Sequence, residues 1–222
     1  MLYSSHSSSI YCCYRHSNKA NHLKRQYCLT CQYPASTCIC QTVEELHCPL
    51  DIVLLQHPQE AKNRKNSARL IPLCMPNARI VVGESARDFE LLLAELRERK
   101  HECCVFYPSH QSQSFENELT DFHKSDFKTW IFLDATWRKA LKMWHLNPWL
   151  HSLPSWHFSS PPSSQYQIRS TKLKDALSTL EAVAYGLQTA QKLDVSALMV
   201  VFNAMQSKQL EFIQAQDIKN IC

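Results

Sequence analysis

Residues 130–146 read WIFLDATWRKALKMWHL, and this stretch decides the fold class of the chain. The first four residues are continuously apolar, as expected of a strand covered on both faces. A helix over 136–146 would then have an apolar face of Trp137, Ala140, Leu141 and Trp144, with Arg138, Lys139 and Lys142 on the opposite face. A buried strand that turns directly into an amphipathic helix is typical of a parallel sheet.

The same alternation continues along the chain from residue 50. Short apolar runs at 52–55, 80–82 and 103–106 predict three further strands. Apolar residues at helical spacing predict helices at 87–99, 177–190 and 194–217, the last with Asp194 as its N-cap. Strands alternating with helices predict an α/β domain with a mainly parallel sheet.

The composition narrows the class of protein. A chain of 222 residues, 45% of them hydrophobic, is long enough to form one domain with a small appendage. Its net charge of +4 permits a nucleic-acid partner without requiring one. The chain has only 2 glycines, Gly83 and Gly186, which cannot build a glycine-rich phosphate loop. P-loop and glycine-fingerprint dinucleotide enzymes are therefore excluded.

The beginning of the chain differs from the rest. Residues 1–25 are polar and serine-rich, and we interpret them as a flexible leader or as residues upstream of the true start. They lack the basic and apolar regions of a signal peptide, and no apolar run in the chain could cross a bilayer. We expect a cytoplasmic protein without membrane contact, divided into the leader 1–25, a cysteine element 26–42 and an α/β domain with C-terminal helices, 43–222.

Four of the 11 cysteines form two close pairs, Cys28-x-x-Cys31 and Cys38-x-Cys40, with Pro34 between them. In a reducing compartment, four thiolates at this spacing indicate a tetrahedral zinc site. A site closed by four cysteines is structural rather than catalytic. Four reduced cysteines without a metal are the alternative, and a redox Cys-x-x-Cys pair is disfavoured because no strand precedes it.

Several polar residues stand where an α/β protein binds ligands, but each also has a structural explanation. Asp134 follows a strand directly, and it could bind a ligand or cap the next helix. Trp137 could line the same site or pack in the core. Ser178 and Glu181 fit a capping box, at a helix start that could also attract an anion. Four basic residues within 62–69 could contact an RNA backbone or lie in a solvated loop.

These motifs occur together, in this order, in one family. The chain resembles the DTW-domain proteins, the tRNA-uridine aminocarboxypropyltransferases, from about residue 28 to about residue 188. The resemblance rests on the four cysteines, Gln56-His57-Pro58-x-Glu60, Asn66-Ser67-Ala68-Arg69-Leu70, Phe106-Tyr107-Pro108, Leu133-Asp134-Ala135-Thr136-Trp137, Tyr166-x-Ile168-Arg169 and Leu177-Ser178-Thr179-Leu180-Glu181-Ala182. Three positions differ from the usual pattern: Ser67 stands for Thr, Ala135 for Gly, and Tyr33 for a common Arg.

The resemblance implies a SPOUT-like fold with a trefoil knot, and S-adenosylmethionine as co-substrate. It implies transfer of the 3-amino-3-carboxypropyl group to N3 of a uridine in the tRNA variable loop, with release of methylthioadenosine. The partner would be tRNA and not DNA.

The resemblance also suggests roles for individual residues. Asp134 would act as general base or orient N3–H. Thr136, Ser178 and Thr179 would hold the amino-acid end of the co-substrate, Glu181 its amine, and Trp137 the pocket wall. Arg64, Arg69 and Arg169 would contact RNA or the carboxylate, and Cys28, Cys31, Cys38 and Cys40 would hold Zn²⁺.

Three other functions fit the same residues. A methyltransferase on the same fold would leave adenosylhomocysteine, and a related enzyme could act on ribosomal RNA. A zinc-bearing RNA-binding module without catalysis would not bind S-adenosylmethionine.

Overall fold

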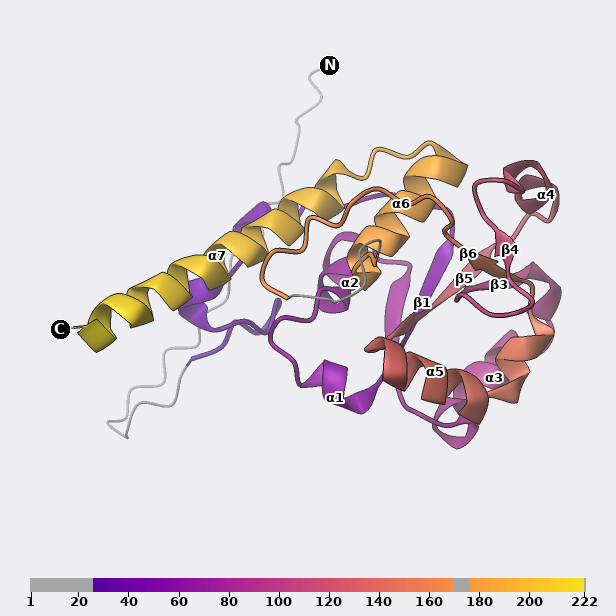
Figure 1. Ribbon diagram of the computed structural model, residues 1–222, viewed down its shortest axis with the longest axis horizontal. Coiled ribbons are helices and arrows are strands. Elements are labelled where there is room, and N and C mark those ends of the chain that lie inside the picture. Colours follow the sequence, from indigo (N-terminus) through magenta and orange to yellow (C-terminus); the bar gives the residue numbers. More distant parts are fainter. Residues whose placement is uncertain (1–25, 170–175, 222) are drawn as a thin grey trace, which may run out of the picture.

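A six-stranded, all-parallel sheet forms the centre of the computed structural model, which describes residues 26–169 and 176–221 (Figure 1). The strands are β1 (Asp51–Gln56), β2 (Ala78–Val82), β3 (Cys103–Phe106), β4 (Gln113–Ser114), β5 (Thr129–Asp134) and β6 (Ser155–His157), and they lie in the order β2-β1-β5-β3-β6-β4. The predicted α/β class and the four predicted strands are confirmed. The expected leader, 1–25, lies outside the described residues.

Both faces of the sheet are covered by helices. Alternate strand residues point to opposite faces, so Leu54 and Phe132 belong to one apolar cluster and Val53 and Ile131 to the other. The first face packs against α2 (Ile71–Cys74), α4 (Leu119–Lys124), α6 (Thr179–Gln191) and α7 (Ser196–Ile221), and the second against α3 (Glu90–Leu96) and α5 (Trp137–Leu146). α1 (Pro58–Ala61) follows β1 directly.

Six 3₁₀ turns complete the described structure: Ala35–Thr37, Cys40–Thr42, Ala68–Leu70, Ala86–Phe89, Lys100–Glu102 and Pro148–Ser152. The predicted helix 87–99 is divided between the 3₁₀ turn Ala86–Phe89 and the shorter α3. Gly186 allows α6 to lie close to the sheet, because a Cβ at this position would stand 3.2 Å from the Trp130 ring. None of the helices among the described residues is sufficiently long and apolar to cross a membrane.

The predicted apolar face of α5 is partly wrong. Ala140 and Trp144 are buried as expected, together with Met143, but Trp137 is 46% exposed and Leu141 is 50% exposed. The first turn of α5 begins beyond the carboxyl end of β5, so the sheet no longer covers Trp137. Helical periodicity identifies an apolar side chain but not the point at which the sheet beneath it ends.

Candidate active site and metal centre

Asp134 ends β5 beside Gln56, which ends β1, and both side chains are buried. The Oδ2 atom of Asp134 accepts hydrogen bonds from Gln56 Nε2 at 2.8 Å and from Asn66 Nδ2 at 2.7 Å. Its Oδ1 atom accepts one from the hydroxyl of Thr179 at 2.6 Å. Three neutral donors from three segments therefore fix the carboxylate in one orientation, at the strand ends where α/β proteins bind ligands.

The start of α6 is organised by the predicted capping box, which is confirmed. Ser178 Oγ accepts from the N–H of Glu181, and Glu181 accepts from the N–H of Ser178 at 2.8 Å. The Glu181 carboxylate also accepts from Ser164 Oγ and from the N–H of Gln165. Glu181 is buried by these contacts and holds the loop before α6. Thr179, the next residue after the cap, is thereby directed at Asp134.

Two adjoining pockets open beside Asp134. The first, about 180 Å³ in volume, is largely aromatic, with Phe106, Phe132, Trp156 and Phe158 among its lining residues. The second, about 510 Å³, is more polar, with a lining that includes Asn66, Ser67, Asp134, Thr136, Tyr166, Arg169 and Ser178. Trp137 and Thr179 line both, as do Ala135, Ala176 and Leu177. The two pockets therefore form a two-part site with an aromatic and a polar half.

Each half contains a polar group with no hydrogen-bond partner among the described residues. Trp156 lines the aromatic pocket and its indole N–H is buried without an acceptor. Tyr166 lines the polar pocket, its hydroxyl is buried in the same way, and burial raises the pKa of that hydroxyl. Buried groups without partners are uncommon in folded proteins. The hydroxyls of Tyr33 and Thr129 and the indole N–H of Trp130 are buried without a partner in the same way, so such a group does not by itself mark the pockets.

Arg169 is held at the polar pocket by Glu60, a carboxylate only 3% exposed. The guanidinium donates to both carboxylate oxygens, at 2.9 and 3.1 Å, and Lys139 Nζ lies 3.7 Å from the same group. Burial by itself would raise the pKa of Glu60, but Arg169, with smaller contributions from Asn63 and Lys139, keeps it below its usual range. The pair joins α1 to the loop before α6.

The other two predicted arginines lie toward the cysteine element rather than in the pockets. Arg69 donates to the carbonyl of Ala61 at 3.1 Å, and its guanidinium lies 5.4 Å from the centre of the Tyr33 ring. Arg64 is bonded to the hydroxyl of Tyr27 at 3.2 Å in an exposed position. The structure therefore groups Asp134, Thr136, Trp137, Ser178, Thr179 and Arg169 around the pockets, and leaves Arg64 and Arg69 outside them.

Gln56, Asn66, Glu60 and Tyr166 received no individual role from the sequence. They were present only as letters of the motifs Gln56-His57-Pro58-x-Glu60, Asn66-Ser67 and Tyr166-x-Ile168-Arg169. Those family motifs were the one signal in the sequence that could have identified these residues as part of the site, because amide and phenol side chains have no spacing that is characteristic of a binding site.

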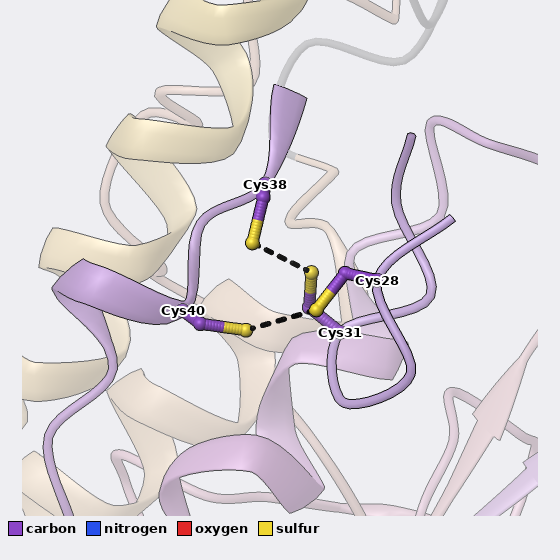
Figure 2. Close-up of side chains that lie close together, drawn as sticks. All are labelled: Cys28, Cys31, Cys38 and Cys40. Carbon is purple, nitrogen blue, oxygen red and sulfur yellow. Dashed lines mark hydrogen bonds between the residues drawn. The ribbon is translucent and has the colours of Figure 1, made fainter. Parts of the chain in front are cut away.

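The four cysteine side chains of the N-terminal element converge on one point (Figure 2). Their sulfur atoms all lie within 4.8 Å of one another, with 3.4 Å between Cys28 and Cys40 and 3.7 Å between Cys31 and Cys38. A tetrahedral site with Zn–S bonds of about 2.3 Å separates its sulfurs by about 3.8 Å. Burial and the neighbouring thiols raise the pKa of the Cys40 thiol and so disfavour the thiolate form. A bound cation would favour the thiolate. The donor set therefore fits Zn²⁺, with small shifts of the sulfur atoms toward this separation.

Comparison with known proteins gives consistent matches. Residues 25–210 match the DTW domain family. The tRNA-uridine aminocarboxypropyltransferase 2 proteins of Macaca fascicularis and Mus musculus are each 27% identical over 173 residues, which cover 76% of this chain and 58% of theirs. The Drosophila melanogaster protein of that name is 28% identical, over 72% of this chain and 65% of its own. The chain thus spans less than two thirds of the length of these relatives. No solved structure matches it significantly.

Proposed function

Because the chain belongs to the DTW domain family, we propose that it transfers the 3-amino-3-carboxypropyl group of S-adenosylmethionine to N3 of a uridine in the tRNA variable loop. The names of its relatives support an aminocarboxypropyltransferase acting on tRNA uridine. The observation that carries the proposal is the fixed carboxylate of Asp134 between an aromatic and a polar pocket.

The two pockets match the two ends of S-adenosylmethionine. The aromatic pocket fits the adenine ring, because adenine stacks on aromatic faces. The polar pocket fits the amino-acid arm, whose carboxylate and amine would meet Thr136, Ser178 and Thr179. Arg169 would face the carboxylate from the opposite wall. The sulfonium would then lie between the pockets, beside Trp137.

Asp134 had two expected roles, to orient N3–H or to accept its proton as general base, and its contacts are compatible with both. Among the described residues, its Oδ1 atom accepts one bond, from Thr179, which leaves a lone pair for the N3–H of uridine. In the proposed step, a bond forms between N3 and the γ-carbon as the bond between that carbon and sulfur breaks. The released electron pair stays on sulfur as methylthioadenosine, and the N3 proton passes to Oδ1 of Asp134 and from there to water. Positioning supplies most of the acceleration.

Glu181 and the arginines outside the pockets have secondary parts in this proposal. Glu181 orders the loop 164–165 and the start of α6, so that Thr179 is held against Asp134. Pairing of Glu181 with the amine of the co-substrate remains a prediction. Arg64 is exposed and is assigned to the tRNA backbone, whereas Arg69 joins the cysteine element to the α/β domain.

We further propose that Cys28, Cys31, Cys38 and Cys40 hold one structural Zn²⁺, and that residues 26–42 and 43–222 are the element and the domain expected from the sequence. Four reduced thiolates in this centre fit a cytoplasmic location. A SPOUT-like, knotted fold is part of the same proposal, supported by the all-parallel sheet and by a site at its carboxyl edge.

The test is nucleoside mass spectrometry after unmodified tRNA is incubated with the purified chain and S-adenosylmethionine. A uridine heavier by one aminocarboxypropyl group, together with methylthioadenosine, is the expected result. A methylated nucleoside with adenosylhomocysteine would instead identify a methyltransferase. Cofactor binding without a new nucleoside would direct the search to ribosomal RNA. A chain that binds no S-adenosylmethionine would be a non-catalytic module.

A further inference from the structure

The exposed side of α5 carries apolar surface that the fold leaves uncovered. Trp137 is 46% exposed and Leu141, one turn further along the helix, is 50% exposed. His145 follows one turn later and is also exposed. We call these three residues the α5 ledge. Contiguous apolar surface next to a pocket marks a site of interaction rather than a random exposed side chain.

A third pocket, about 440 Å³ in volume, adjoins the α5 ledge, and we call it the side pocket. It is lined by Tyr107, Pro108, Ser109, His110, Gln111, Leu141, Trp144, His145 and His151. Tyr107 and Pro108 also line the aromatic pocket, so these two residues separate the side pocket from the candidate active site. Its wall includes two ring–ring contacts. The Tyr107 and Trp144 rings stack with their centres 4.9 Å apart, and the tilted His151 ring has its centre 4.6 Å from that of Trp144.

The charges around the side pocket favour an anion. None of its lining residues is acidic, and three of them are histidines. Arg138 and Lys142 lie exposed on the same helix, and Lys142 contacts Glu84 at 2.9 Å. Basic side chains beside the exposed Trp137 ring form the kind of surface that binds single-stranded nucleic acid.

We propose that the α5 ledge and the side pocket bind the nucleotide next to the target uridine of the tRNA, an inference that rests on the proposed function. The base of that nucleotide packs against the exposed Leu141 side chain, and its phosphate meets His110 and His145. The target uridine itself is directed toward Asp134, on the other side of Tyr107. The rise of the helix, about 1.5 Å per residue, places His145 about 12 Å along the axis from Trp137. That distance accommodates more than a single base.

Leu141→Glu tests the proposal, because this side chain lines the side pocket and neither of the other two. Leu91→Glu is the matched control: Leu91 is 89% exposed on α3, and the change in charge and composition is identical. Both variants replace exposed residues, and melting curves verify that each is folded. The Kd for unmodified tRNA is measured at several salt concentrations, and the Kd for S-adenosylmethionine by calorimetry.

Leu141→Glu is expected to weaken tRNA binding about 5-fold or more, because the half-exposed Leu141 side chain loses its apolar contact with the base and a negative charge takes its place. Its affinity for S-adenosylmethionine and all properties of Leu91→Glu should equal those of the wild type. Equal tRNA binding by the two variants, with active wild type, would overturn this proposal alone. Absence of any tRNA binding by the wild type would overturn the proposed function with it. Self-association of the wild type that Leu141→Glu abolishes, with tRNA binding unchanged, would identify a protein interface instead.

Discussion

Replacement of Asp134 by Asn and by Ala separates the charge of this residue from its hydrogen bonds. Asn has the same shape, with one oxygen and one amide group. Its oxygen can accept from Gln56 and Asn66, as Oδ2 of Asp134 does at 2.8 and 2.7 Å. Its amide can then donate to Thr179, whose hydroxyl turns to accept. Each group that bonds Asp134 retains a partner. We therefore expect the free energy of unfolding of Asp134→Asn to lie within about 1 kcal/mol of that of the wild type.

Asp134→Ala leaves the same donors in a buried site without an acceptor. Gln56 retains a longer bond to Asn66 Oδ1 at 3.2 Å, so the loss falls mainly on Asn66 and Thr179. Buried donors without partners cost about 1–3 kcal/mol each, which gives a loss of about 3 kcal/mol. In a chain of this size that lowers the melting temperature by roughly 6–12 °C.

The assays are urea and thermal unfolding of both variants, and transfer to unmodified tRNA followed by mass spectrometry. Asp134→Asn should fold normally and lose transfer at least 100-fold, because the pocket wall no longer carries a negative charge. Near-normal transfer by Asp134→Asn would show that the negative charge of Asp134 is not required for transfer. Equal unfolding free energies for the Asn and Ala variants would refute the reasoning about the hydrogen bonds.

The other predictions concern the remaining buried contacts. Glu60→Gln should destabilise the chain by about 2 kcal/mol at neutral pH, because Arg169 loses a charged partner. The pKa of Glu60 is lowered in the folded state, so the wild type should lose free energy of unfolding as the pH falls below the ordinary range of a glutamic acid, and Glu60→Gln should lose less. Urea unfolding from pH 3 to 7 measures this, and the same dependence of the unfolding free energy on pH in both proteins would contradict it. Cys38→Ser should lower bound zinc below one ion per chain by elemental analysis, and an unchanged zinc content would exclude the centre. Glu181→Gln should raise KM for S-adenosylmethionine more than it lowers kcat, because Ser164 and the loop at the pocket lose an acceptor; the reverse pattern would make Glu181 a reacting group.

The strands could be predicted where the sequence itself carries the signal. β1, β3 and β5 are continuous apolar runs because both faces of the sheet are buried there, and β2, at the edge of the sheet, is an apolar run that is only partly buried. β4 and β6 were missed because Gln113–Ser114 and Ser155–His157 are short and partly polar, and only pairing with neighbouring strands makes them extended. The capping box of α6 was predictable because its two members lie three residues apart and contact each other in any helix.

The contacts of the candidate site could not be predicted in the same way. Gln56 lies 78 positions and Asn66 68 positions from Asp134, and no local pattern states that their amides meet one carboxylate. Trp137 was assigned two alternatives, and its exposure depends on where β5 ends beneath the helix. The sequence indicated the type of group at the site through the family motifs, while long-range pairing decided which groups touch.

Three buried carboxylates surround the two pockets, and they differ in what neutralises them. Glu60 is paired with Arg169 and Lys139. Glu181 lies outside the lining of both pockets and accepts from the hydroxyl of Ser164 and from the backbone N–H groups of Gln165 and Ser178. Among the residues that the structure describes, Asp134 accepts from neutral side chains alone, and it lines the polar pocket with Arg169 acting on it at a distance. Asp134 is therefore the carboxylate whose charge a cation in the pocket would feel. On the proposed reaction, a sulfonium is attracted to this wall before transfer, and the neutral thioether that leaves is not. The same residue that orients the uridine would thus favour binding of the co-substrate over retention of its product.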